Sequence, residues 1–64
     1  MKLMKLKAVM ECTGLARSTV YKFIAEDRFP KPVKLGTRMV AWLESEIQEW
    51  IQEKVEVRDT IERL

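Results

Sequence analysis

Five side chains that can donate or accept hydrogen bonds lie within six consecutive positions of the first half of the sequence. They are Arg17, Ser18, Thr19, Tyr21 and Lys22. An arginine can donate two hydrogen bonds to the edge of a guanine, and a serine hydroxyl can pair with either a donor or an acceptor. Threonine, tyrosine and lysine suit phosphate oxygens, which position a protein on DNA without specifying its sequence. The group therefore predicts a surface that binds double-stranded DNA, with Arg17 and Ser18 as base readers.

A second group of polar side chains surrounds a glycine after two prolines. Its members are Lys31, Lys34, Thr37 and Arg38, with Gly36 among them. A basic loop beside a DNA-reading helix reaches the phosphate backbone or the minor groove, which is the role of a wing. An ordinary β-turn with solubilising lysines is the alternative interpretation, because hairpin turns are usually polar.

The sequence lacks the groups that small active sites use. It contains one cysteine, Cys12, and no histidine. Neither a thiolate activated by histidine nor a zinc cluster is therefore expected. The glutamates of the last third recur at helical spacing, which is typical of a solvated helix face. We expect no enzyme, no cofactor and no metal site, and we expect Cys12 to be buried or half-buried.

The length and charge of the chain set its scale. Its 64 residues make one small domain, residues 1–64, with a thin core and no deep catalytic cleft. Residues 1–42 carry nine bases and three acids, a net +6, whereas residues 43–64 carry three bases and seven acids, a net −4. This division predicts that the first two thirds face a polyanion. No apolar run reaches the length of a membrane span, so we expect a cytoplasmic protein with no membrane partner.

Periodicity and punctuation predict a mainly α chain with a small β-hairpin. Gly14 is expected to end a first helix, and Pro30 and Pro32 a second one. Acidic residues open the last helical segment, where the helix dipole favours them. In order, we expect a helix over residues 5–13, a helix over 17–27, a tight hairpin of residues 33–35 and 38–42 around Gly36 and Thr37, and a long helix from Leu43.

The first two helices are predicted to form a helix-turn-helix, whose second helix enters the major groove of DNA. Its inner face is formed by apolar residues of both helices, namely Val9, Leu15, Val20 and Ile24. The outer face of residues 17–27 then binds DNA or, in the alternative, is only solvated. Ala16 stands at the cap position without the hydroxyl that stabilises a helix start. Either the helix starts there uncapped, or Ser18 caps it two residues later and leaves Arg17 as the sole base reader.

The last third of the chain carries two tryptophans and a repeated apolar pattern. Trp42 and Trp50 are expected in the core, where they seal the hairpin against the first helix. Apolar residues recur in steps of four and three, with Lys54 as the one break, which is the pattern of a coiled-coil seam. The seam comprises Leu43, Ile47, Trp50, Val57, Ile61 and Leu64.

Two interpretations of this seam stay open. In the first, residues 52–64 are a helical extension of the domain, and residues 43–64 pair with a second copy or with an integrase. In the second, the local core is completed by Leu43, Ile47, Trp50 and Ile51 while the tail frays.

Several segments together resemble the AlpA family of phage regulatory proteins. The similar segments are residues 13–24, residues 29–36, Ala41-Trp42 and Trp50-Ile51. This family belongs to the MerR-like winged helix-turn-helix group, and its members are small DNA-binding proteins of prophages and genomic islands. Some regulate integrase genes, and others resemble excisionases. The resemblance implies a recognition helix over residues 17–27 and a wing over residues 34–38. Ala16 departs from the serine that is most common in the family, which bears on the helix cap but not on the fold.

The predicted function is therefore sequence-specific DNA binding by a protein of phage or genomic-island origin. It would act as a transcriptional regulator, for example of an integrase gene, or as an excisionase-type recombination factor. The alternative is a protein-interaction module, similar to an anti-repressor, that binds a partner protein through the last helix. DNA binding through several phosphates would weaken steeply with rising salt, which distinguishes the two classes.

Overall fold

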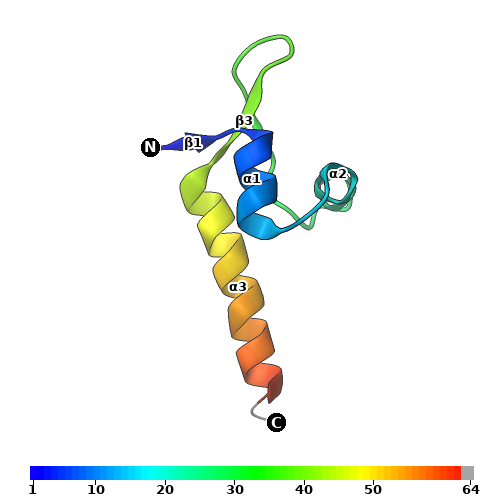
Figure 1. Ribbon diagram of the computed structural model, residues 1–64, viewed down its shortest axis with the longest axis vertical. Helices are drawn as coiled ribbons and strands as arrows, with labels where there is room; N and C mark the ends of the chain where they lie inside the picture. Colours follow the sequence, from blue (N-terminus) through cyan, green and yellow to red (C-terminus); the bar gives the residue numbers. More distant parts are fainter. Residues whose placement is uncertain (63–64) are drawn as a thin grey trace.

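The computed structural model describes residues 1–62 as three helices and a small antiparallel sheet. The elements are β1 (Leu3–Met4), α1 (Leu6–Thr13), α2 (Arg17–Ala25), β2 (Val33–Lys34), β3 (Val40–Leu43) and α3 (Glu44–Glu62). The hairpin of β2 and β3 lies at one end of the molecule, and α3 runs from it to the other end (Figure 1). Helices α1 and α2 lie beside the first part of α3, so the second part projects alone and the molecule is elongated, 47 × 25 × 19 Å. None of the described helices is long and apolar enough to cross a membrane.

The sheet has the order β1-β3-β2, with β3 in the middle. β1, which the sequence pattern did not predict, pairs Met4 with Trp42 and Leu3 with Leu43. Leu43 is thus the last residue of a strand, and the prediction that the long helix includes it is wrong. The amide of Glu44 donates to the carbonyl of Lys2 (2.8 Å), so pairing with β1 continues up to the first residue of α3.

The hairpin loop is longer than the predicted tight turn. The carbonyl of Met39 accepts hydrogen bonds from the amides of Leu35 (2.7 Å) and Gly36 (3.2 Å). β3 therefore begins at Val40, two residues after the predicted start at Arg38. The residues that connect the two strands are 35–39, and this segment is called the hairpin loop below.

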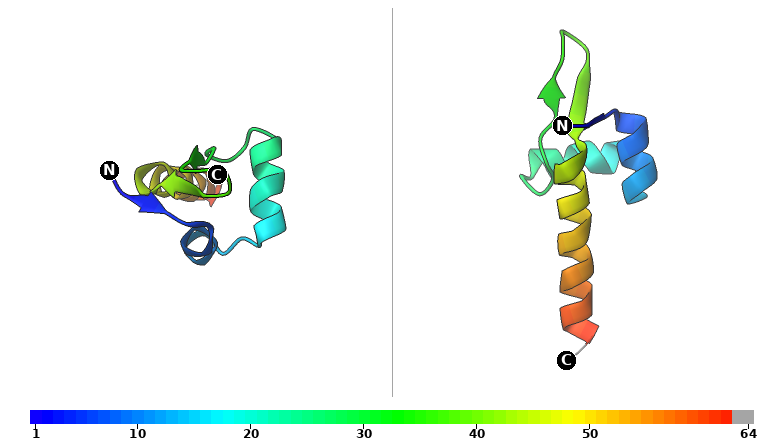
Figure 2. Two further views of the ribbon diagram at one scale, coloured as in Figure 1. Left: turned by 90° about the horizontal axis from the view of Figure 1, so that it is seen from above. Right: turned by 90° about the vertical axis from the view of Figure 1, so that its left-hand side faces the viewer.

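The turn between α1 and α2 follows the prediction. Gly14 adopts a left-handed conformation (φ 74°), and its amide donates to the carbonyl of Met10 (2.8 Å). The hydroxyl of Thr13 donates to the carbonyl of Val9 (2.8 Å) and accepts from the amide of Leu15 (3.3 Å). These bonds fix a short connection, and the two helices cross steeply (Figure 2).

Helix α2 ends at Ala25, two residues before the predicted end, and the prolines are not the cause. Asp27 adopts a left-handed conformation (φ 61°), and its amide donates to the carbonyl of Ile24 (3.0 Å). The amide of Arg28 donates to the carbonyl of Phe23 (2.8 Å). This pair of bonds is the Schellman motif, which closes a helix from within the last turn.

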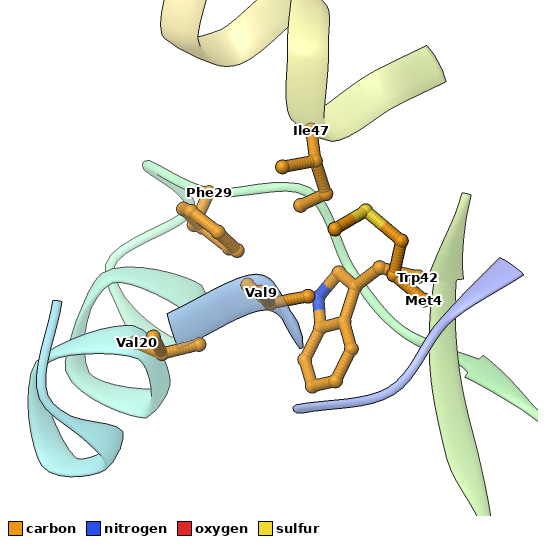
Figure 3. Packing of buried hydrophobic residues seen from close by; sticks show 6 residues of the cluster. All are labelled: Met4, Val9, Val20, Phe29, Trp42 and Ile47. Carbon is orange, nitrogen blue, oxygen red and sulfur yellow. The ribbon is translucent and has the colours of Figure 1, made fainter. Parts of the chain in front are cut away.

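One apolar cluster joins the three helices to β1 and β3. It consists of Met4, Val9, Val20, Phe29, Trp42 and Ile47. The side chain of Val9 lies between Val20 and the indole of Trp42 (Figure 3), so α1 contacts both α2 and the sheet. Trp42 is fully buried, as predicted, and its Nε1 donates to the carbonyl of Pro30 (2.9 Å). The arrangement is that of a winged helix-turn-helix, the predicted fold class.

Two smaller predictions about the core are corrected. Trp50 does not seal the hairpin. It packs on Phe29 (ring centroids 4.9 Å apart) and donates from Nε1 to the carbonyl of Arg28 (2.8 Å), which holds the segment after α2 against α3. Cys12 is exposed rather than buried or half-buried, and it lines an open hollow between the end of α1 and α3.

The apolar pattern of the last third divides into two parts. Ile47 is fully buried, and Trp50 and Ile51 pack against the core, as the second interpretation predicts. Val57 and Ile61 are 56% and 64% exposed. The helix continues to Glu62, and Leu64 lies outside the described residues. A continuous seam from Leu43 is therefore wrong, because its first part is used by the chain's own core.

Candidate nucleic-acid interface

The outer side of α2 presents the predicted reading residues. Val20 is buried against α1, and Leu15 and Ile24 are half-buried beside it. The opposite side carries exposed Ser18 and Lys22, with exposed Tyr21 and half-buried Thr19 at the borders between the two sides. Arg17 is exposed at the start of the helix, but it lies three residues before Val20 and therefore on the same side as Val20 and Ile24. The predicted division into an apolar inner face and a polar outer face is thus present, with Arg17 at its N-terminal edge.

Helix α2 begins at Arg17, with Ala16 as its N-cap in an extended conformation. No side-chain hydrogen bond caps this start, and no acidic residue lies in the first turn. Capping by Ser18 two residues later is therefore wrong, and the uncapped alternative is right. Ser18 lies in the first turn, beside Arg17 and on the exposed side of the helix.

The predicted wing residues lie on and beside the hairpin loop. Lys34, Thr37 and Arg38 are all exposed. Lys31 lies before β2 and is held differently, because its Nζ is 3.7 Å from a carboxylate oxygen of Asp27. The structure thus places three of the four predicted residues where their polar groups face solvent, and the fourth in an exposed ion pair.

The hairpin loop and α2 share a hollow with the start of α1. The hollow has a volume of about 330 Å³. The polar side chains that line it are Lys5, Lys7, Arg17, Tyr21 and Arg38. The structure therefore brings together residues from the predicted reading helix and the predicted wing, along with two lysines that the sequence pattern did not single out.

The bases of the described chain fall into two groups. Ion pairs join Lys2 to Glu44 (3.7 Å), Arg28 to Glu26 (3.2 Å), Lys31 to Asp27 (3.7 Å) and Arg58 to Asp59 (2.9 Å). Within residues 1–62, six bases of the first two thirds form no such pair. These unpaired bases are Lys5, Lys7, Arg17, Lys22, Lys34 and Arg38. Their charge is not neutralised by the described part of the protein, so it remains available to an external anion.

The acidic residues of the described chain are arranged differently. Glu44 and Glu46 lie in the first turn of α3, where they oppose the positive end of the helix dipole. Among the described residues, no three His, Cys, Asp or Glu side chains are grouped so as to hold a metal ion. Asp27, Glu46, Glu49 and Glu53 line a hollow between the end of α2 and α3, together with Arg28 and Lys54. The polar side chains of the hollow beside the hairpin loop are instead bases and a tyrosine, which suit an anionic ligand.

Comparison with known proteins shows the family to which this chain belongs. The family model described as prophage CP4-57 regulatory protein (AlpA) matches residues 2–55. The chain is 40% identical over 52 residues to protein ORF88 of Enterobacteria phage P4, a match that covers 81% of this chain and 59% of the phage protein. It is also 36% identical over 59 residues to the DNA-binding transcriptional activator AlpA of Escherichia coli strain K12, which covers 83% of this chain and 84% of the relative. The chain thus spans less than two thirds of the phage P4 protein's length. It belongs to the AlpA family of prophage regulatory proteins.

Proposed function

We propose that the protein is a sequence-specific DNA-binding regulator of transcription of phage type. The observation that carries this proposal is the exposed outer face of α2, which has an uncapped start and begins with an arginine that forms no ion pair within residues 1–62. Such a helix fits the major groove, where its first residues meet base edges. Membership in the AlpA family and the DNA-binding activity of the Escherichia coli relative support the same class. A DNA partner also agrees with the predicted cytoplasmic location.

Each polar side chain of α2 has a proposed role. Arg17 reads a guanine through two hydrogen bonds, and Ser18 contacts a neighbouring base edge. Tyr21 and Lys22 bind phosphate oxygens, as does the half-buried Thr19 through its hydroxyl. Because α2 ends at Ala25, the element in the groove comprises residues 17–25 instead of 17–27.

The hairpin loop is the proposed wing. Lys34, Thr37 and Arg38 contact the backbone or the minor groove beside the site of α2. Lys31 adds to this surface only by exchanging its ion pair with Asp27 for a phosphate. Because that pair is exposed, with the two side chains 73% and 84% accessible, the exchange costs little.

The Arg17→Ala variant tests the role of α2. A preferred duplex is first selected from a random pool with the wild-type protein. The substitution is expected to weaken binding to that duplex by roughly 1–3 kcal/mol and to change binding to random DNA far less. Arg58→Ala, on the acidic part of α3, is the matched control and is expected to bind like the wild type. Equal weakening on both duplexes would show that Arg17 does not read bases.

The position of the binding site distinguishes regulation from recombination. A footprint of the wild-type protein that overlaps a promoter, such as that of an integrase gene, is expected for a transcriptional regulator. Protection of repeats within an attachment site, with no promoter nearby, would instead indicate an excisionase. Both roles use the same helix and loop, so the footprint is the direct test.

A second candidate activity concerns the C-terminal part of α3. Val57 and Ile61 are exposed one helical turn apart, at 56% and 64%, and both lie beyond residues 2–55 of the family match. We propose that this part extends beyond the DNA-binding domain and pairs with a second copy or with a partner protein such as an integrase. Sedimentation of the full chain and of the Val57→Gln, Ile61→Gln variant tests the homodimer. A larger mass for the wild type alone is expected, and identical monomeric masses would exclude a homodimer.

A further inference from the structure

The hollow between the start of α1, the start of α2 and the hairpin loop has a uniform charge. Four bases line it, namely Lys5, Lys7, Arg17 and Arg38, and no acidic residue of the described chain does. Within residues 1–62 none of the four forms an ion pair. The remaining polar side chain is Tyr21, whose residue is 40% exposed. The acid next to these bases is Glu11, which lines an adjoining hollow with Lys7 and Arg17 but forms no ion pair within residues 1–62. An anion bound among the four bases would reduce their mutual repulsion.

The start of α1 adds a second attraction for an anion. Its N-cap residue, Lys5, makes no side-chain cap hydrogen bond, and no acidic residue lies in the first turn. The first amide groups of a helix have no partner within the helix and form the positive end of its dipole. Leu6 and Lys7, which carry two of these amides, line the hollow. An anion there would receive hydrogen bonds from backbone and side chains together.

The sheet holds the walls of the hollow in place. Met4 pairs with Trp42, and Lys5 follows Met4 directly. Met39 and Val40, which precede Trp42 by a few residues, line the hollow opposite the start of α1. Figure 1 shows the start of α1 beside β3, at the base of the hairpin loop. The pairing of β1 with β3 thus brings Lys5 and Lys7 close to the hairpin, which is distant from them in the sequence.

We propose that this hollow binds a backbone phosphate of the DNA through Lys5, Lys7 and the first amides of α1, with Arg38 and Tyr21 completing the site. The proposal rests on the proposed function and extends the interface to α1. A phosphate held here lies next to Arg17, so its binding fixes how α2 enters the groove. Because every sequence has the same backbone, this phosphate adds affinity without sequence preference.

The salt dependence of DNA binding measures the role of this hollow. The Lys5→Gln, Lys7→Gln variant is compared with a Lys2→Gln, Lys54→Gln control, in which the same charge is removed from exposed lysines outside the hollow. Affinity of each full-length protein for a random duplex and for the preferred duplex is measured by fluorescence anisotropy over a range of salt concentrations. Circular dichroism verifies that both variants are folded.

The salt dependence of DNA binding is expected to change in one of the two variants only. In the Lys5→Gln, Lys7→Gln variant, the slope of log affinity against log salt should become shallower by about 0.9 for each phosphate that the protein no longer neutralises. The decrease in affinity should be equal on the random and the preferred duplex. The control should keep the wild-type slope.

Two other results would overturn the proposal, and they differ from each other. Wild-type binding to DNA with equal slopes in the two variants would remove the hollow from the interface and leave the proposed function standing. Absence of wild-type binding to any duplex would overturn the proposed function and the phosphate site with it.

Discussion

The starts of α1 and α3 differ in the charges that surround them. α3 begins with Glu44 and Glu46 in its first turn, whereas α1 begins with Lys5 as N-cap and Lys7 two residues later, without an acid. An acidic side chain near a helix start stabilises it by roughly 0.3–1 kcal/mol, and a basic one there opposes the helix dipole. α3 therefore stabilises its own start, whereas the start of α1 has neither an acid nor a capping side chain.

The ion pairs follow the same division. Lys2 and Lys31 lie beside Glu44 and Asp27, whereas the six unpaired bases lie on α1, α2, β2 and the hairpin loop, or directly before α1. Exposed ion pairs contribute at most about 1 kcal/mol, so their main effect here is to neutralise charge locally. The unpaired bases therefore lie on the first two thirds of the chain, although the Lys2–Glu44 ion pair joins that part to α3.

The largest expected effect is the loss of stability on replacing Trp42, which shares one core cluster with residues of α1 and α3. Trp42 is fully buried between α1 and the sheet, and its indole donates to the carbonyl of Pro30. Replacement by alanine should cost about 3–5 kcal/mol, because a large cavity replaces the indole. A domain of this size has a total stability of about 5 kcal/mol, so Trp42→Ala should lose cooperative unfolding in urea, followed by circular dichroism. A cooperative transition at the wild-type midpoint would show that Trp42 does not hold α1 and α3 in one core.

Much of this fold could be predicted because its signals are local. The apolar spacing of α1 and the glycine at position 14 predict the first helix and its end correctly. β1 could not be found in this way, because a two-residue strand has no periodicity and its partner β3 lies far along the chain. The early end of α2 depends on the left-handed conformation of Asp27, which an aspartate adopts less readily than a glycine does.

The candidate site was predictable to a similar degree. The polar side chains of α2 are recognisable because they share one helix, and Lys34 to Arg38 because they surround a turn. Lys5 and Lys7 contribute to the same charge count, but their approach to Arg38 depends on the pairing of β1 with β3. The exposure of Cys12 likewise depends on how α3 lies beside the end of α1, which the spacing within α1 does not reveal.

The second largest effect is expected on DNA affinity when bases in and beside the hairpin loop are removed. The Lys34→Gln, Arg38→Gln variant should bind every duplex more weakly, with a salt slope shallower by about 1 for each base removed, because both residues are exposed and belong to the unpaired bases. The Lys54→Gln, Arg58→Gln variant removes two bases of α3 and serves as the control. Equal salt slopes in these two variants, measured by fluorescence anisotropy, would show that the bases of the hairpin contribute no more to DNA binding than the bases of α3.

The smallest effect is expected from Lys5→Ser, which should raise the stability of the protein and lower its affinity for DNA. Lys5→Ser gives α1 the capping hydroxyl that it lacks, so the free energy of unfolding should rise by about 1 kcal/mol. The same change removes a base from the hollow and should weaken DNA binding several-fold. Urea denaturation and anisotropy measure the two quantities. Stability and affinity that rise together would show that the start of α1 does not bind an anion.

If the proposed interface is right, DNA binds the unpaired bases and leaves α3 free. Amide chemical shifts of the ¹⁵N-labelled protein, recorded during titration with the preferred duplex, test it residue by residue. Chemical-shift changes are expected at residues 5–7, 17–22 and 34–38, and none along residues 47–61 of α3. Changes confined to α3, with the starts of α1 and α2 and the hairpin loop unaffected, would contradict it.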